Sequence, residues 1–169
     1  MTSDNSFYHN NPLASTDGQR TAEGFTLVEL LSVIAIIAVL TAIAIPASDA
    51  YTTKARIGRT IAELRMLEKE ITVYQMDKGA LPETLGDIGF GDLNDPWRKP
   101  YQYLRIAGSG INGKGQLRRD RAINPLNTDY DLYSMGRDGE SKTNLNAKQS
   151  LDDIVRARDG AFIDLAEKF

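Results

Sequence analysis

The 169-residue chain contains no cysteine and a single histidine, His9. The lack of cysteine excludes disulfide bonds, thiolate catalysis and zinc–thiolate sites. One histidine, close to the N-terminus, leaves little basis for acid–base, nucleophilic or transition-metal chemistry. The formal net charge is only −3, which does not mark the chain as a nucleic-acid binder. We therefore expect neither an enzyme nor a nucleic-acid partner.

Charge is almost absent from residues 25–45, where Glu29 is the only charged side chain. At about 1.5 Å per residue, these roughly 21 residues form a helix of about 31 Å, which is long enough to cross a bilayer core. The preceding residues 1–23 are polar and lack apolar periodicity, which predicts disorder or a removable leader. Pro46 follows the apolar run and is expected to kink or weaken the helix, because proline has no N–H group.

Beyond Pro46 the apolar residues recur at steps of three and four, which predicts that an amphipathic helix continues. This apolar stripe consists of Ile57, Ile61, Leu64, Leu67, Ile71 and Tyr74. The basic Lys78 followed by Gly79 favours a helix end near Lys78.

Two segments of alternating polarity, residues 101–106 and 129–135, predict paired antiparallel strands. Loops are expected over 107–128 and 136–150, and a short helix over 151–157. A small sheet laid across the apolar stripe would bury it. The predicted fold is therefore α+β, with a long N-terminal helix and a small antiparallel sheet on its second half. Four aromatic side chains are expected to cover the stripe: Trp97, Tyr101, Tyr103 and Tyr133.

The long loop 107–128 carries two further patterns. Residues 108–113 have the spacing GxGxxG, but no helix follows them, so a flexible loop is the better interpretation. Four basic residues could contact DNA phosphates or an acidic neighbouring subunit, but without interleaved aromatics a solvated loop face is favoured. These residues are Lys114, Arg118, Arg119 and Arg121.

Residues 24–31, GFTLVELL, and the apolar run that follows resemble the prepilin peptidase site of type IV pilins and type II secretion pseudopilins. In that family the bond after the glycine is cut on the cytoplasmic side and the new first residue is N-methylated. The fifth residue of the mature chain is glutamate, and proline is common at the twenty-second. Phe25, Glu29 and Pro46 match these three positions.

The resemblance implies processing between Gly24 and Phe25, which would remove residues 1–24 as a leader. Residues 25–46 would form the transmembrane and polymerisation helix, and residues 47–169 a globular domain. Phe25, Glu29 and Pro46 would serve assembly, with Glu29 attracting the terminal amine of a neighbouring subunit. An intramembrane carboxylate is a functional candidate on physical grounds as well. The alternative is an ordinary signal anchor, or a signal peptide cut after Ala50, although the apolar run would be longer than the ~7–15 residues usual in a signal peptide.

Two segments of the second half resemble major pseudopilins in particular. Residues 95–103, DPWRKPYQY, are similar to their DPWGxPYxY segment, with Arg98 where glycine is usual. Residues 131–139, DLYSMGRDG, are similar to their DxYSxGxDG segment. In those proteins the following loop wraps a calcium ion, using backbone carbonyls and acidic side chains.

By position, the resemblance implies a possible calcium site formed by Met135, Asp138, Asp152 and Asp153. Calcium takes about 6–8 oxygen ligands, and a bound ion would stabilise a loop that has no disulfide bond. The alternative is that Asp138 shapes a turn with Gly139 and that Asp152 caps the short helix expected after it.

Taken together, the resemblance implies a structural subunit of a type II secretion pseudopilus that supports export of folded proteins. Its partners would be further copies of itself in a helical filament, prepilin peptidase, minor pseudopilins and the inner-membrane assembly platform. It would sit in the cytoplasmic membrane through residues 25–45, with the globular domain in the periplasm. Two alternatives stay open: a type IV pilus pilin for adhesion, motility or DNA uptake, and a membrane-anchored binding domain that does not polymerise.

Overall fold

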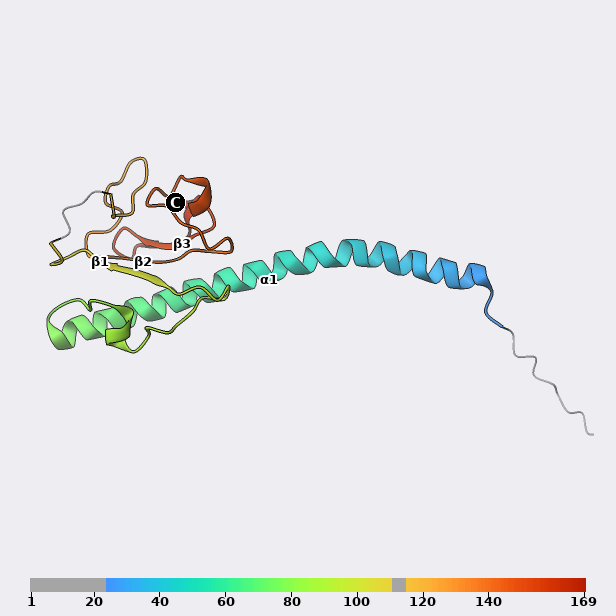
Figure 1. Ribbon diagram of the computed structural model, residues 1–169, viewed down its shortest axis with the longest axis horizontal. Coiled ribbons are helices and arrows are strands. Elements are labelled where there is room, and N and C mark those ends of the chain that lie inside the picture. Colours follow the sequence, from blue (N-terminus) through green and yellow to red (C-terminus); the bar gives the residue numbers. More distant parts are fainter. Residues whose placement is uncertain (1–23, 111–114) are drawn as a thin grey trace, which may run out of the picture. The chain divides into compact units, whose positions relative to one another are not determined.

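The computed structural model describes residues 24–110 and 115–169 (Figure 1). The expected leader, apart from Gly24, lies outside the described residues, as do Lys114 and the end of the GxGxxG segment. The contacts within the chain divide it into one unit that ends at Ile43 and a second unit, Ala44–Phe169. The boundary falls within the long helix α1, Leu27–Lys78.

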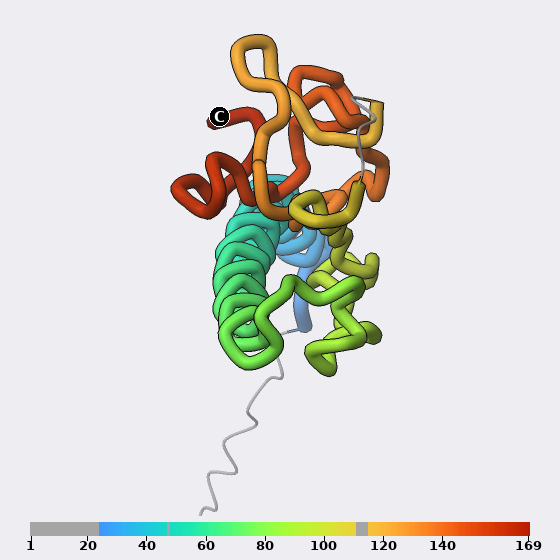
Figure 2. The backbone as a smooth tube through the Cα atoms, turned by 90° about the vertical axis from the view of Figure 1, so that its left-hand side faces the viewer, coloured from blue at the N-terminus to red at the C-terminus, as the bar shows by residue number. Residues whose placement is uncertain are grey.

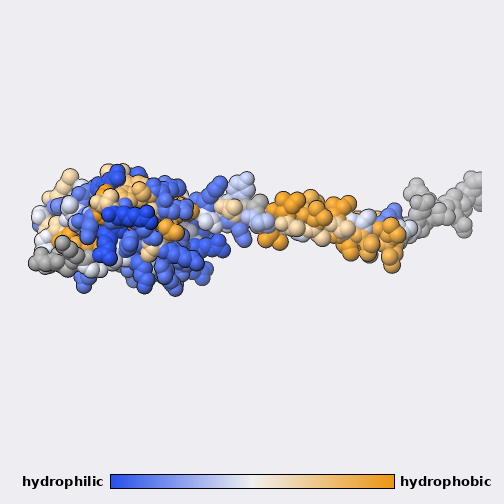
Figure 3. All heavy atoms as spheres, turned by 90° about the horizontal axis from the view of Figure 1, so that it is seen from above, coloured by the Kyte–Doolittle hydropathy of each residue, from blue (hydrophilic) through white to orange (hydrophobic). Residues whose placement is uncertain are grey.

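In the first unit, the described residues, 24–43, are all exposed and consist of the start of α1 and the three residues before it. Figure 3 shows that apolar side chains gather along this part of the helix. The few hydroxyl groups bond to the helix's own backbone: Ser32 Oγ donates to the Glu29 carbonyl (2.8 Å) and Thr41 Oγ1 to the Ile37 carbonyl (2.9 Å). The surface of this stretch is therefore apolar, with its polar groups satisfied locally.

The helix α1 runs through Pro46 and ends at Lys78, followed by Gly79 with φ 74°. The predicted end near Lys78 is confirmed, and Pro46 does not terminate the helix. A glycine with positive φ directly after a helix is the usual C-terminal cap. A short 3-10 helix, η1 (Leu85–Ile88), follows.

The second unit contains a four-stranded antiparallel sheet with strand order β1-β2-β3-β4. The first two strands, β1 (Gln102–Arg105) and β2 (Tyr130–Ser134), confirm the two predicted strands and pair with Tyr103 opposite Leu132. The other two are β3 (Ile154–Ala157) and β4 (Phe162–Leu165), with Arg156 opposite Ile163. Two further 3-10 turns, η2 (Lys148–Ser150) and η3 (Ala166–Lys168), flank this pair.

The predicted short helix over residues 151–157 is wrong, because Ile154–Ala157 forms the strand β3. All four of its residues are buried, since β3 lies between β2 and β4 and is covered on both faces. The strand includes the charged Arg156, which is buried as well, so its four residues show no alternation of exposed and buried positions from which a strand could be predicted.

One face of the sheet packs on the second half of α1. Leu64, Leu67 and Ile71 are completely buried there against Leu132 and Ile154. Ile57 and Ile61 are partly buried in the same cluster, so the predicted apolar stripe is confirmed over most of its length. Figures 1 and 2 show the sheet between α1 and the loops of the last third of the chain.

The opposite face of the sheet carries a second apolar cluster. Its buried members are Leu126, Leu145, Val155, Ala157 and Ala166. Tyr133 packs against this cluster, whereas Trp97, Tyr101 and Tyr103 belong to the cluster at α1. The prediction that Tyr133 covers the stripe is therefore wrong: Leu132 already faces α1, and adjacent residues of a strand point to opposite faces.

Candidate functional site

The expected processing site lies at the start of α1 and is fully accessible. The Phe25 side chain is 84% exposed, and among the described residues no atom beyond the chain neighbours of Gly24 lies within 4 Å of the position a Cβ would take there. Nothing in the fold therefore requires glycine at position 24. A requirement for glycine there would have to come from a molecule that acts on this segment.

Glu29 closes the first turn of α1 by a reciprocal contact with Thr26. Its Oε2 accepts hydrogen bonds from the Thr26 backbone N–H (2.9 Å) and the Thr26 hydroxyl (2.8 Å), and the Glu29 N–H donates to Thr26 Oγ1 (3.2 Å). This arrangement is a capping box. The Thr-x-x-Glu spacing before an apolar run is the sequence signal for this cap, so Glu29 has a local structural role in addition to the expected role in assembly.

The apolar part of α1 is the third feature of this region. Among the described residues, α1 is the one helix long and apolar enough to cross a membrane, judged by length and composition. None of the residues in its most apolar stretch is buried within the chain. Phe25, Glu29 and this exposed stretch therefore lie in the same unit, while Pro46 lies in the second.

The DPWRKPYQY segment forms a tight turn organised by the buried Asp95. Its Oδ1 accepts hydrogen bonds from the backbone N–H groups of Trp97 and Lys99 (both 2.9 Å), and its Oδ2 accepts one from Ser134 Oγ (2.5 Å). The turn places Arg98 at φ 66°, the left-handed region that favours glycine. The one departure of this segment from the pseudopilin pattern therefore falls at a position where the backbone suits glycine.

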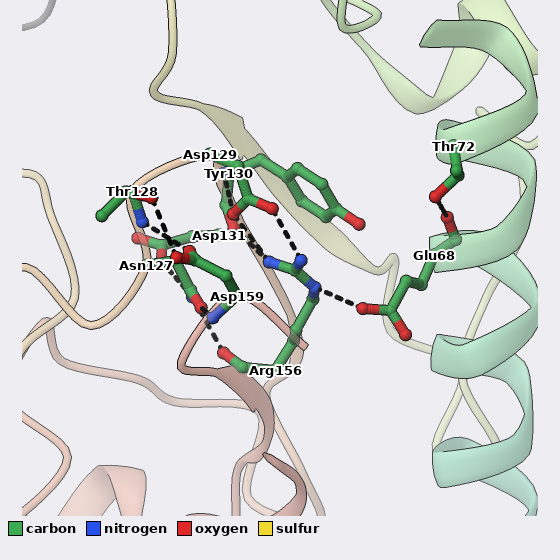
Figure 4. Close-up of polar contacts among 9 residues, drawn as sticks. All are labelled: Glu68, Thr72, Asn127, Thr128, Asp129, Tyr130, Asp131, Arg156 and Asp159. Atoms are coloured by element: carbon green, nitrogen blue, oxygen red, sulfur yellow. Dashed lines mark hydrogen bonds and ion pairs between the residues drawn. The ribbon is translucent and has the colours of Figure 1, made fainter. Parts of the chain in front are cut away.

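A buried arginine connects the sheet to α1 (Figure 4). Arg156 on β3 donates from Nε to Glu68 on α1 (2.8 Å) and from both terminal nitrogens to Asp129 (2.8 and 2.6 Å). Its guanidinium also lies over the Tyr130 ring, 4.0 Å from the centroid. Burial by itself would lower the pKa of Arg156, but the hydrogen bonds to Asp129 and Glu68 raise it by more, so the pKa lies above its ordinary value. We call these four residues the Arg156 cluster.

The four residues expected to bind calcium are already engaged by the protein. Asp152 Oδ2 accepts hydrogen bonds from the N–H groups of Arg137 (2.8 Å) and Asp138 (3.0 Å), so Asp152 does not cap a helix. Asp138 Oδ1 accepts from the Glu140 N–H (2.8 Å), and the Met135 carbonyl accepts from the Gly139 N–H (3.2 Å). Asp138 therefore shapes the turn around Gly139, as the alternative interpretation expected.

Gly136 is needed for this arrangement. Its φ is 64°, and a Cβ at this position would collide with the backbone oxygen of Asp152. The close approach of residues 136 and 152 thus depends on the absence of a side chain at position 136.

Asp153 is completely buried and contacts Arg118. Its Oδ2 accepts hydrogen bonds from an Arg118 terminal nitrogen and from Ser141 Oγ, each at 2.5 Å. Burial raises the pKa of Asp153 to about 6, against the opposing effect of Arg118. We call Arg118 and Asp153 the Arg118 pair. Arg118 is 3% exposed, so the prediction that it belongs to a solvated basic loop face is wrong.

These contacts test whether the four residues suit calcium. Within residues 24–110 and 115–169, the acidic side chains form no group of three or more placed to share a metal ion. A calcium ion on Asp153 Oδ2 would displace Arg118 and leave a guanidinium buried without a counter-charge. As they lie, the residues do not fit calcium, and we derive no role through it.

Comparison with known proteins gives matches to pilins and secretion proteins. Residues 19–45 match the family described as the prokaryotic N-terminal methylation motif. The chain is 25% identical to type II secretion system core protein G of Pseudomonas aeruginosa, over 72% of this chain and 88% of that protein. It is 26% identical to the core protein G of Aeromonas hydrophila, over 74% of this chain and 90% of that protein.

A second kind of relative matches a shorter part of the chain. The fimbrial protein of Neisseria meningitidis is 34% identical over 84 residues, which cover 50% of this chain and 49% of that protein. The match thus spans about half the length of the fimbrial protein. No solved structure matches the chain.

Proposed function

Because this chain belongs to the type IV pilin-like proteins, we propose that it is the structural subunit of a type II secretion pseudopilus. The observation that carries this proposal is the exposed apolar stretch of α1, which begins directly after the accessible Gly24–Phe25 bond. Exposed apolar side chains of this number require a membrane or copies of the same helix around them. In the precursor the membrane surrounds these side chains, and in the filament the helices of neighbouring subunits surround them.

The extent of the similarity supports the pseudopilus over the pilus. The two core G proteins align over 72% and 74% of the chain, whereas the fimbrial protein aligns over 50%. A type IV pilus pilin remains the second candidate, favoured by the higher identity of the fimbrial protein. Deletion of the gene separates the two: loss of secreted proteins from the medium supports the pseudopilus, and loss of surface fibres supports the pilus.

In the proposed assembly cycle, prepilin peptidase cuts between Gly24 and Phe25 on the cytoplasmic side, and Phe25 is N-methylated. The globular unit then lies in the periplasm, and the assembly platform and minor pseudopilins act on it there. Cutting creates a cationic amine one residue before Thr26, which already contacts Glu29. The Glu29 carboxylate then pairs with the Phe25 amine of a neighbouring subunit, which neutralises both charges in apolar surroundings.

The test uses Glu29→Ala, with Asp49→Ala as the matched control. Asp49 is an exposed carboxylate on the same helix beyond Pro46. We expect both variants to be processed to a chain that begins at N-methylated Phe25, as measured by mass spectrometry. Glu29→Ala should lose incorporation into sheared filaments, while Asp49→Ala should retain it. Normal incorporation of Glu29→Ala would reject the proposed pairing.

A further inference from the structure

The Arg118 pair lies where three segments distant in sequence meet on the face of the sheet opposite α1. Arg118 comes from the long loop before β2, Ser141 from the loop after β2, and Asp153 from the residue before β3. The two side chains of the pair are 3% and 0% exposed, and their closest atoms are 2.5 Å apart. This is a fully desolvated ion pair between two loops.

The Arg118 guanidinium makes two contacts in addition to its ion pair with Asp153. Its second terminal nitrogen donates to Ser141 Oγ (2.8 Å), and its central carbon lies 3.8 Å from the centroid of the Tyr133 ring. Asp153 Oδ2 therefore accepts from two groups that also contact each other. One atom of each side chain, Arg118 Nε and Asp153 Oδ1, is buried and has no hydrogen-bond partner among the described residues, so the pair is held through Asp153 Oδ2 and the terminal nitrogen Nη2 of Arg118.

The backbone fixes Arg118 in place from both sides. The Arg118 N–H donates to the buried Asp131 Oδ2 (3.1 Å), and its carbonyl accepts from the Leu126 N–H (2.7 Å). The next residue, Arg119, exchanges backbone hydrogen bonds with Thr143 (2.8 Å) and Leu145 (3.0 Å). The long loop is therefore joined to β2 and to the loop 136–150, and the position of Arg118 is set by the fold.

A buried carboxylate needs a counter-charge, and arginine supplies one that cannot be lost by deprotonation. We infer that Arg118 is the internal cation of the C-terminal region, which neutralises Asp153 and makes this region independent of calcium. The long loop 107–128 then has a structural role: it carries this cation into the interior. A calcium ion bound to the buried Asp153 carboxylate would lie beside the buried Arg118 guanidinium, and two adjacent cations repel each other strongly away from water, so the two arrangements exclude each other.

The experiment follows thermal unfolding of the full chain in detergent, by circular dichroism and Trp97 fluorescence, in millimolar calcium chloride and in excess EGTA. We expect the wild type to melt at the same temperature in both, since a bound calcium would raise the midpoint as its concentration rises. Arg118→Met should lower the midpoint by on the order of 10 °C, because it leaves a buried charge unpaired. The matched control, Arg119→Met at the exposed neighbouring position, should melt with the wild type.

Two further variants keep the test decisive if Arg118→Met fails to fold. Arg118→Lys retains the charge and should melt between the wild type and Arg118→Met. The double variant Arg118→Met/Asp153→Leu removes both charges and should melt above Arg118→Met alone. A wild-type midpoint that falls in EGTA would overturn the inference and restore calcium as the cation. An Arg118→Met midpoint equal to that of Arg119→Met, or a double variant no more stable than the single one, would overturn it as well.

Discussion

Arg98 shows how a single residue departs from what its backbone favours. It sits in the turn between Asp95 and Lys99 with φ 66°, and its N–H donates to the Asp95 carbonyl (2.8 Å). A side chain in the left-handed region costs about 1 kcal/mol relative to glycine, although glycine loses more entropy on folding. Arginine therefore stands where the pseudopilin pattern has glycine and where the backbone conformation favours glycine.

We predict that Arg98→Gly increases the free energy of unfolding by about 0.5–1 kcal/mol, because it relieves the left-handed strain. Urea denaturation followed by Trp97 fluorescence measures the change. Arg137→Gly is the matched control: Arg137 is also an exposed arginine in a turn, but it does not have a positive φ. This control should be neutral or destabilising. A loss of stability in Arg98→Gly would show that the arginine side chain makes a contribution larger than the strain.

At the scale of elements, the contact between α1 and the sheet combines an apolar core with one polar connection. Leu64, Leu67 and Ile71 supply the core, and the Arg156 cluster joins β3 to Glu68 beside it. Arg156 is held by five contacts: Glu68, both oxygens of Asp129, the Tyr130 carbonyl and the Tyr130 ring. Such a convergent set fixes the side chain in one position and thereby fixes how β3 lies along α1 (Figure 4).

We predict that Arg156→Met lowers the free energy of unfolding by about 2 kcal/mol, below the ~3–5 kcal/mol that follows when a deeply buried charge loses its partner. The loss is smaller because Glu68 and Asp129 remain 24% and 31% exposed, so water can reach them. Arg65→Met, an exposed arginine on α1, is the control and should change stability by less than about 0.5 kcal/mol. Equal denaturation midpoints for the two variants would contradict a stabilising role for the cluster.

At the scale of the whole molecule, the two units differ in what surrounds their apolar side chains. The second unit buries apolar side chains in two clusters on either face of the sheet, while the apolar side chains described in the first unit, from residue 25 to residue 43, are all exposed. The core contacts of α1 begin at Ile57, well beyond Pro46. The stability of the globular unit is therefore independent of the apolar stretch, which has a role in the membrane or the filament.

We predict that a chain of residues 51–169 is soluble without detergent and unfolds at the same urea concentration as the full chain in detergent. Its far-ultraviolet circular dichroism should retain the helical signal of the second half of α1. Introducing Arg156→Met into this shorter chain should reproduce the loss seen in the full chain. A shorter chain that is unfolded or aggregated would show that the apolar stretch contributes to folding of the globular unit.

The sequence by itself determined the long helix, its exposed apolar stretch, the stripe of its second half and the strands β1 and β2. Each depends on a local pattern: an uncharged run, a step of three and four, or an alternation bounded by turn residues. The fixed spacing of Gly24, Phe25, Glu29 and Pro46 likewise lies within one segment. A single sequence contains all of this information, because the residues concerned are neighbours along the chain.

Only the tertiary structure decided which distant residues meet. It made β3 a strand by covering both of its faces, turned Tyr133 away from α1, and brought Arg118 across 35 positions of sequence to Asp153. In each case the outcome depends on burial and pairing between separate segments, which no local period encodes. A basic residue in a polar loop looks solvated in the sequence, and its partner becomes visible only when the loop is folded onto the sheet.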